Sequence, residues 1–159
     1  MSRLNNGDRF PSLQLNAVGG GKLSLPDDLA GSFGVVLAYR GSWCPYCNAQ
    51  LAEFSRAGDT LAELGVKVAA LSADDEATSA ALVAKHRLMF PVAHSADAGT
   101  VAAATGAYTN PEPSYLQSTG FVLAPDGTVL TAVYSSGAIG RLVADDVIGF
   151  VKYVQSQAH

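Results

Sequence analysis

The sequence predicts an α/β protein built on a central mixed β-sheet flanked by helices. Segments of strand character alternate with segments of helical character along most of the chain, which indicates parallel strands joined by right-handed crossovers. Only 15% of the 159 residues are charged, against about 25% in an average globular chain, and this suits a sheet covered on both faces. No repeat or long linker interrupts the chain, so we expect a single domain over residues 1–159.

The N-terminal part of the chain predicts three strands. Residues 10–15 alternate apolar and polar, and residues 22–25 follow a glycine turn at 19–21, so the two segments are expected to pair as an N-terminal β-hairpin. Residues 35–39 form a continuous apolar run of strand length, which is typical of a buried central strand.

A long helix is expected next, because apolar residues at helical spacing run from the Cys44 region to a natural stop at Gly65. Beyond it we expect a strand at 66–72, a helix at 77–85, a strand at 90–93, a helix at 100–104 and a loop at 108–117. A hairpin of strands 119–123 and 129–134 follows around Pro125-Asp126-Gly127, and a last helix opens at Asp145.

Composition narrows the class of function. The net charge is −4, which gives no electrostatic reason to expect a nucleic-acid or membrane partner. The first residues carry no apolar run of a signal peptide, and no stretch approaches the roughly 18 apolar residues of a membrane span, so we expect a cytoplasmic protein. No glycine-rich phosphate loop follows a strand, and we expect no metal, haem or nucleotide cofactor.

Cys44 and Cys47 are the only cysteines, and they flank Pro45 where a buried strand meets a helix. With Cys44 as the N-cap, Pro45 falls at the first helical position, which its fixed φ favours. Cys47 then lies one turn on, so a short reversible disulfide is geometrically possible. The free amides and the positive end of the helix dipole lower a thiol pKa there.

Two other interpretations of these cysteines are less favoured. A zinc site needs two more ligands, but His86 and His94 are too far apart for the usual finger pattern and His159 is terminal. Two inert core cysteines are the other alternative, and a pair flanking proline at a strand–helix junction argues against it.

Several motifs resemble those of a known family. The segment Trp43-Cys44-Pro45-Tyr46-Cys47 resembles the thioredoxin and glutaredoxin active-site motif, and the wider chain resembles the peroxiredoxin (AhpC/TSA) family, in a subgroup defined by Cys-x-x-Cys. The family resemblance is carried by Gly7-Asp8 before Phe10-Pro11, by Phe90-Pro91-Val92 with Ser95 and Asp97, and by the segment 121–127. It implies a thioredoxin-like fold.

The alignment to the peroxiredoxin motif Pro-x-x-x-Thr-x-x-Cys also shows departures. Cys47 takes the position of the cysteine that meets peroxide, Cys44 replaces the threonine and Arg40 replaces the proline. Gln50 replaces a glutamate that often follows, and Ser118 stands where the family has a distant arginine and near the expected thioredoxin cis-proline. These changes weaken the case for efficient peroxide reduction but leave redox chemistry in place.

The resemblance implies a thiol-dependent peroxidase that reduces hydroperoxides through a dithiol/disulfide cycle of Cys44 and Cys47. A thioredoxin- or glutathione-type thiol would be the reductant, and a homodimer is compatible with it. The alternative is a thioredoxin-like protein-disulfide reductase or redox-partner module for which peroxide is incidental. We expect Cys44 to be the more exposed sulfur, so that peroxide oxidises a recessed Cys47 and Cys44 resolves the product.

Three further residues are candidates for substrate binding. Arg40 could supply the positive charge that Ser118 lacks, although a solvated side chain or one paired with a surface carboxylate is the more ordinary expectation. Trp43 could shield the disulfide, although plain core packing is more usual. Tyr46 could line a partner groove, and simple exposure is the alternative.

The remaining polar residues of interest predict structural roles. His94 could donate a proton, but a structural histidine is the expected case because no motif places it near Cys44. Asp74 and Asp75 follow a strand and are expected to cap the next helix.

Overall fold

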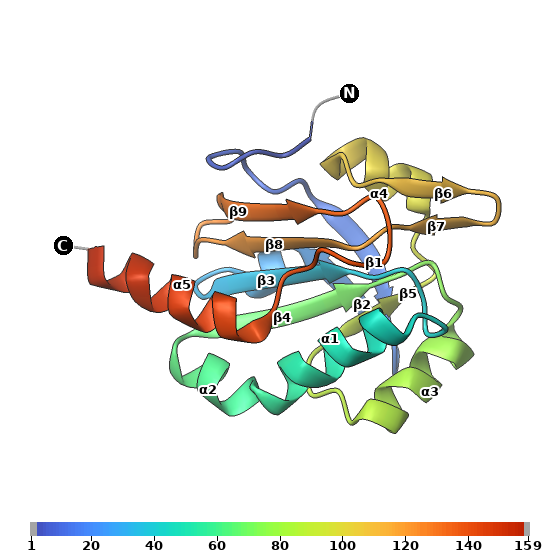
Figure 1. Ribbon diagram of the computed structural model, residues 1–159, viewed down its shortest axis with the longest axis horizontal. Coiled ribbons are helices and arrows are strands. Elements are labelled where there is room, and N and C mark those ends of the chain that lie inside the picture. Colours follow the sequence, from blue (N-terminus) through green and yellow to red (C-terminus); the bar gives the residue numbers. More distant parts are fainter. Residues whose placement is uncertain (1–2, 158–159) are drawn as a thin grey trace.

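The structure, a computed structural model, describes residues 3–157 and contains one mixed sheet of seven strands. Their order across the sheet is β2-β1-β5-β4-β3-β8-β9 (Figure 1). The strands are β1 (Leu13–Ala17), β2 (Lys22–Leu25), β3 (Phe33–Ala38), β4 (Val66–Leu71), β5 (Val92–His94), β8 (Thr119–Leu123) and β9 (Val129–Tyr134).

The strand pairing confirms the predicted mixed sheet. Strand β4 lies between β3 and β5 and pairs parallel with both, whereas β8 pairs antiparallel with β3 and with β9. The expected N-terminal hairpin is formed by β1 and β2, and β1 joins the sheet through an antiparallel pairing with β5.

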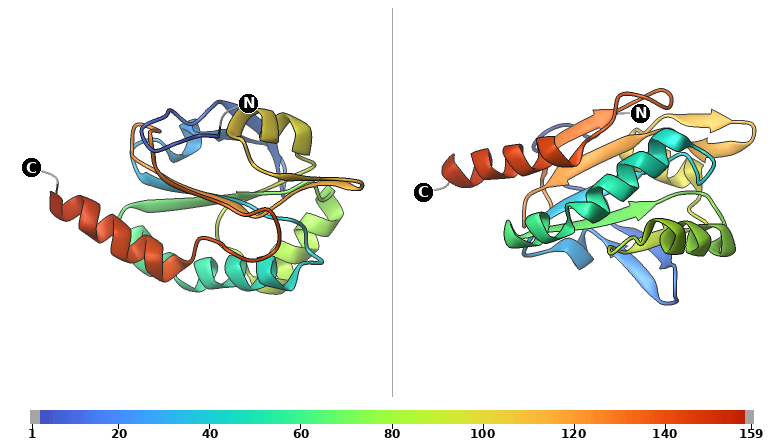
Figure 2. Two further views of the ribbon diagram at one scale, coloured as in Figure 1. Left: turned by 45° about the horizontal axis from the view of Figure 1, so that its top comes forward. Right: turned by 60° about the horizontal axis from the view of Figure 1, so that its bottom comes forward.

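Helices lie on both faces of the sheet (Figure 2). One face carries α1 (Pro45–Arg56), α2 (Gly58–Glu63), α3 (Glu76–His86) and α5 (Ala144–Gln157). The other face carries α4 (Ala98–Thr105), the single-turn helix η1 (Asp27–Leu29) and the N-terminal segment.

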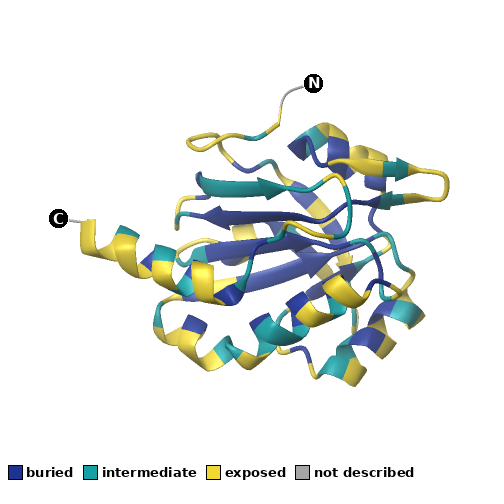
Figure 3. Ribbon diagram, in the orientation of Figure 1, coloured by how far each residue is buried: buried dark blue, intermediate teal, exposed yellow. Residues whose placement is uncertain are grey.

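Strand β3 shows how the core is divided between these two faces. Val35, Leu37 and Tyr39 pack into the cluster under α1 and α5, whereas Val36 and Ala38 pack into the opposite cluster. This alternation follows from the two-residue period of a strand. Apart from the half-buried Phe33 and the exposed Lys67, the residues of β3, β4 and β8 are buried (Figure 3), and each fully buried large apolar side chain contributes about 1.5–3 kcal/mol. The loop after β3 therefore starts from a strand that is packed on both faces.

Two predicted elements differ from the structure. The single helix expected up to Gly65 divides at Ala57, where the backbone (φ −83°, ψ 4°) forms a turn and the next residue is Gly58. Residues 108–117 were expected to be a loop, but they contain an antiparallel hairpin of β6 (Thr109–Pro111) and β7 (Ser114–Leu116).

Candidate active site

Cys44 is the N-cap residue of α1, as predicted. Its backbone is extended (φ −92°, ψ 114°), its sulfur accepts a hydrogen bond from the Cys47 amide at 3.4 Å, and Pro45 occupies the first helical position. Both cysteines are free thiols. The chain thus places two sulfurs in the first turn of a helix, where amides and the helix dipole favour negative charge.

Two donors from different parts of the chain converge on the sulfur of Cys47. The backbone N–H of Arg40, in the segment between β3 and α1, donates to Cys47 Sγ at 3.3 Å. The guanidinium of Arg141, in the loop between β9 and α5, donates through Nη2 at 3.4 Å. A sulfur that carries negative charge is stabilised by this arrangement.

Arg141 is held in place by its other hydrogen bonds. Nη1 donates to Gln50 Oε1 at 2.7 Å, and Nε and Nη2 donate to the Ala138 carbonyl at 3.0 and 2.7 Å. Gln50 is buried and donates in turn to the Leu142 carbonyl at 2.7 Å. The glutamine that replaces the family glutamate therefore orients the arginine.

Arg141 was not predicted as a site residue. Ser118, to which the sequence alignment assigned the family arginine, is buried directly before β8, and its carbonyl accepts from the Ser135 amide at 3.0 Å. Arg141 lies 94 positions from Cys47, outside any motif, so no local pattern in the sequence indicated it.

Arg40 lies against the other sulfur. Its Nη1 is 3.7 Å from Cys44 Sγ, Nε donates to Gln117 Oε1 at 2.9 Å, and Nη2 donates to the Tyr115 hydroxyl at 3.3 Å. Its guanidinium also stands 4.8 Å from the centre of the Trp43 ring. The expectation of a solvated or carboxylate-paired arginine was wrong, because the β6–β7 hairpin, missed in the sequence, supplies uncharged partners.

The two aromatic candidates differ in their surroundings. Trp43 is 54% exposed and packs edge-to-face on Tyr115 with ring centres 5.0 Å apart. Its expected place in the core was therefore wrong, since the hairpin offers it a partner at the surface. Tyr46 is exposed, in agreement with the plainer of its two predicted roles.

Neither cysteine has exposed surface, each having a relative exposure of 0%. The expectation that Cys44 is the more exposed sulfur was wrong. Arg40 lies against Cys44 and brings the Trp43 and Tyr115 rings beside it, so the helix N-terminus is covered rather than open.

The surroundings of the two thiols shift their pKa values in opposite directions. Burial opposes ionisation of Cys44, but hydrogen bonds from the Cys47 thiol and amide and from Arg40 outweigh it, so the pKa of Cys44 is lowered. Burial and the hydrogen bond with Cys44 raise the pKa of Cys47 against the opposing effects of Arg40 and Arg141. The first proton is thus lost from Cys44 and the second is retained on Cys47.

The two aspartates after β4 have different roles. Asp75 caps α3, as predicted, by accepting from the Thr78 amide at 2.8 Å. Asp74 does not cap the helix. Its Oδ2 accepts from the Ser42 amide at 2.8 Å and so ties down the loop that precedes Cys44, and burial raises the pKa of Asp74.

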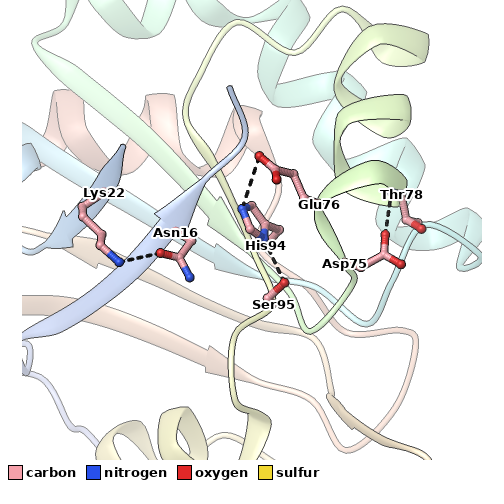
Figure 4. A network of polar contacts seen from close by, with 7 residues as sticks. All are labelled: Asn16, Lys22, Asp75, Glu76, Thr78, His94 and Ser95. Atoms are coloured by element: carbon pink, nitrogen blue, oxygen red, sulfur yellow. Dashed lines mark hydrogen bonds and ion pairs between the residues drawn. The ribbon is translucent and has the colours of Figure 1, made fainter. Parts of the chain in front are cut away.

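His94 has the structural contacts expected of it (Figure 4). Its Nδ1 lies 2.8 Å from Ser95 Oγ and its Nε2 lies 3.7 Å from a carboxylate oxygen of Glu76. Within residues 3–157 it has no hydrogen bond to either cysteine or to the arginines beside them.

The described residues form neither a metal centre nor a membrane-spanning helix. Within 3–157, no three His, Cys, Asp or Glu side chains lie close enough together to hold a metal ion. The helices of this part of the chain are all too short or too polar to cross a membrane.

Comparisons with known proteins identify the family. The model of the AhpC/TSA family matches residues 6–132. A peroxiredoxin of Treponema denticola is 27% identical over 156 residues, which cover 94% of this chain and 73% of the relative. A peroxiredoxin of Methanothermobacter thermautotrophicus is 24% identical over 147 residues, covering 89% of this chain and 69% of the relative.

Solved structures show the same fold. The crystal structure of peroxidoxin BcpB from Mycobacterium tuberculosis superposes with a TM-score of 0.83 at 22% identity, over 96% of this chain and 99% of that one. The AhpC of Enterococcus faecalis gives a TM-score of 0.82 at 18% identity, over 98% and 94% of the two chains. The chain therefore belongs to the AhpC/TSA family of peroxiredoxins, which are thiol-dependent peroxidases with a thioredoxin-like fold.

Proposed function

We propose that this protein reduces hydroperoxides through a two-cysteine cycle in which Cys47 is oxidised by peroxide and Cys44 resolves the product. The observation that carries this proposal is the convergence of the Arg40 amide and the Arg141 guanidinium on Cys47 Sγ, at 3.3 and 3.4 Å. Such fixed donors stabilise a thiolate and also the negative charge that develops on a peroxide oxygen during attack.

The cycle has three steps. The Cys47 thiolate attacks one peroxide oxygen, the O–O bond breaks, and the alkoxide or hydroxide that leaves is protonated, which gives a sulfenic acid on Cys47. The Cys44 thiolate then attacks this sulfur and expels hydroxide, which takes a proton from solvent and leaves as water, so that a Cys44–Cys47 disulfide forms. Two equivalents of an external thiol reduce the disulfide and are themselves oxidised to a disulfide.

The lowered pKa of Cys44 supports its role as the resolving nucleophile. In the singly ionised pair the proton resides on Cys47, and its transfer to Cys44 through the hydrogen bond between the two sulfurs would generate the thiolate that meets peroxide. The same proton then protonates the leaving alkoxide, which restores the Cys44 thiolate for the resolving step.

Burial of the site favours a small substrate. Neither cysteine has exposed surface, and hydrogen peroxide needs much less room than the extended chain of a protein disulfide. We assign Arg40 to the wall of the peroxide site and Trp43 and Tyr46, both exposed, to its approach.

The test replaces each cysteine by serine and adds a sulfenic-acid trap after one equivalent of hydrogen peroxide. We expect the Cys44→Ser protein to carry the trap on Cys47 and the Cys47→Ser protein to react little. The opposite result would contradict the proposal, because it would make Cys44 the sole nucleophile. A trap on neither variant, under conditions in which the wild-type protein loses both thiols, would also contradict it.

The second candidate function is disulfide reduction, and the pKa order of the thiols favours it. A Cys44 thiolate at a helix N-cap is the arrangement that exchanges with an external disulfide. Reduction of insulin disulfides, measured beside stopped-flow oxidation by hydrogen peroxide, separates the two functions. Rapid oxidation without insulin reduction supports the peroxidase, and the reverse supports the reductase.

The reductant, the cellular location and the oligomeric state of the protein stay predictions. We propose a thioredoxin- or glutathione-type thiol as the electron donor, because the disulfide would join two sulfurs within one helical turn and so suit thiol exchange. Because Cys44 is buried, this step requires that Arg40 and the rings beside it first move away from the sulfur. A cytoplasmic location and a homodimer are part of the same proposal and are open to fractionation and light-scattering measurements.

A further inference from the structure

The site holds two cations without carboxylate partners. Arg40 and Arg141 each reach one sulfur, and within residues 3–157 no ion pair joins an arginine or a lysine to a carboxylate. The acidic side chains tied to the segments around the site do not neutralise the arginines, since Asp74 accepts from the Ser42 amide and Glu53 from the Ala144 amide.

Arg40 retains unused hydrogen-bonding capacity on the outer side of the site. A guanidinium has five N–H groups, whereas Arg40 makes one described contact from each of its three nitrogens. Two of its partners, Gln117 and Tyr115, are uncharged. Arg40 is only partly buried, so a charged group arriving from solvent can meet it before reaching the sulfur.

The redox state of Cys44 decides whether this charge is balanced. In the reduced protein Cys44 is the group that can carry a negative charge beside Arg40, and its lowered pKa favours that ionisation. In a Cys44–Cys47 disulfide both sulfurs are uncharged, and the guanidinium loses that anion. The oxidised form, which is the one that a reductant meets, therefore carries the larger uncompensated positive charge.

We propose that Arg40 makes the oxidised protein selective for negatively charged thiols as reductants. This inference rests on the proposed function, because it requires the Cys44–Cys47 disulfide. A thiol whose carboxylate or sulfonate lies a few bonds from its sulfur can pair with Arg40 while its thiolate attacks Cys44 Sγ.

The exchange then proceeds in two steps. Attack on Cys44 breaks the bond between the two sulfurs, and Cys47 leaves as a thiolate beside Arg141. A second molecule of thiol attacks the reductant's sulfur in the mixed disulfide and releases the Cys44 thiolate beside Arg40. One thiol disulfide is formed for each protein disulfide reduced.

The experiment follows the reductive half-reaction alone. Protein is oxidised beforehand, and its reduction by 2-mercaptoethanesulfonate, 2-mercaptoethanol and cysteamine is followed by acid quench, alkylation and mass spectrometry. Rates are expressed per thiolate and corrected for the basicity of each thiol. At low ionic strength we expect the anionic thiol to reduce the protein about threefold or more faster than the neutral thiol, and the neutral thiol to reduce it about threefold or more faster than the cationic thiol. These differences in rate should shrink in high salt.

Variants assign the effect to Arg40. Arg40→Gln should abolish the ranking and Arg40→Lys should preserve it, since lysine keeps the charge. Arg56→Gln is the matched control, because Arg56 is exposed at the far end of α1, about 18 Å along the helix from Cys44, and should keep the wild-type ranking.

The outcomes separate this inference from the proposed function. A flat ranking in wild-type protein, or a ranking that survives in Arg40→Gln, would overturn the inference while leaving the peroxidase cycle intact. If peroxide produces no Cys44–Cys47 disulfide, both fail together. The ranking of the three thiols and its salt dependence are measured on the wild-type protein. The inference can therefore be refuted even if the Arg40→Gln protein does not fold.

Discussion

At the scale of single residues, the ionisation of Cys47 depends on a balance between burial and two donors. Burial and the hydrogen bond with Cys44 raise its pKa, while the Arg40 amide and Arg141 act in the opposite direction. Because the amide belongs to the backbone, Arg141 is the donor that a side-chain substitution can remove. The arginine's remaining hydrogen bonds, to Gln50 and Ala138, fix its position without neutralising its charge.

The first residue-scale prediction is that Arg141→Gln slows the oxidation of Cys47 by hydrogen peroxide about 10- to 100-fold. A hydrogen bond to a charged group contributes about 1.5–3 kcal/mol, and each 1.36 kcal/mol corresponds to a factor of about ten in rate. Stopped-flow measurement of the second-order rate constant checks it, with Arg56→Gln as the charge-matched control. A rate within a factor of about two of wild type would show that Arg141 does not serve the reacting sulfur.

The second residue-scale prediction concerns Asp74 and the dependence of stability on pH. Burial raises the pKa of Asp74 from its ordinary value of 3.8 in the folded protein, so the folded state binds a proton that the unfolded state has already lost. The contribution of Asp74 is therefore most favourable below the unfolded pKa and is lost as the pH rises through the folded pKa. Asp74→Asn can still accept from the Ser42 amide and does not titrate.

Urea unfolding at a series of pH values from about 3.5 to 7 checks this prediction. We expect the free energy of unfolding of wild type, relative to Asp74→Asn, to fall as the pH rises through this interval. Asp59→Asn, at an exposed position of α2, is the control and should follow wild type. Parallel curves for wild type and Asp74→Asn would contradict the assigned direction of the shift.

Among the secondary-structure elements, the strands that have a clear apolar pattern and are bounded by recognisable turns could be predicted from the sequence. The bounds expected for β2, β8 and β9 agree with the structure, because glycine turns and alternating or apolar runs mark them. The hairpin of β6 and β7 was missed because each strand has only three residues, too few for a period to show. Its prolines at 111 and 113 also argued for a loop, although proline is tolerated at exposed strand edges.

The division of the expected long helix at Ala57 has a different cause. Phe54 and Leu61 both pack into the core cluster beneath the sheet, so their spacing suggested one continuous apolar face. The turn at Ala57 allows α2 to bury Leu61 from a new direction. The apolar periodicity predicted which residues are buried, but it did not predict that the helix axis changes direction between α1 and α2.

At the level of the whole molecule, the fold brings together three separate segments at the site: the start of α1 with the loop before it, the β6–β7 hairpin, and the loop between β9 and α5. The cysteines were predictable because Cys44, Pro45 and Cys47 are local to one helix turn. The cover over Cys44 depends on a hairpin more than 70 positions away, and the donor to Cys47 depends on a loop 94 positions away. The mixed sheet itself was predictable from connection rules, but the path of an irregular loop over the site was not.

The position of the loop that carries Arg141 can be tested by a substitution in the strand on which the loop packs. Gly120 lies in β8, and a Cβ there would stand 2.9 Å from Leu142 Cβ, next to Arg141. The Leu142 carbonyl also accepts the hydrogen bond of Gln50, which orients the arginine. We expect Gly120→Ala to cost about 1–3 kcal/mol of stability through overpacking and to slow oxidation by peroxide, because the displaced loop moves Arg141 away from Cys47.

Urea unfolding and stopped-flow oxidation by hydrogen peroxide check this prediction on the same preparations. Gly58→Ala is the control, since its added methyl group meets open space, and it should gain about 0.4–1 kcal/mol without a change in rate. Adding Leu142→Gly to Gly120→Ala removes the Leu142 Cβ that the new methyl group meets at 2.9 Å and should recover part of the lost rate even if stability stays low. If Gly120→Ala is destabilised yet reacts at the wild-type rate, the packing of Leu142 on β8 does not control the position of Arg141.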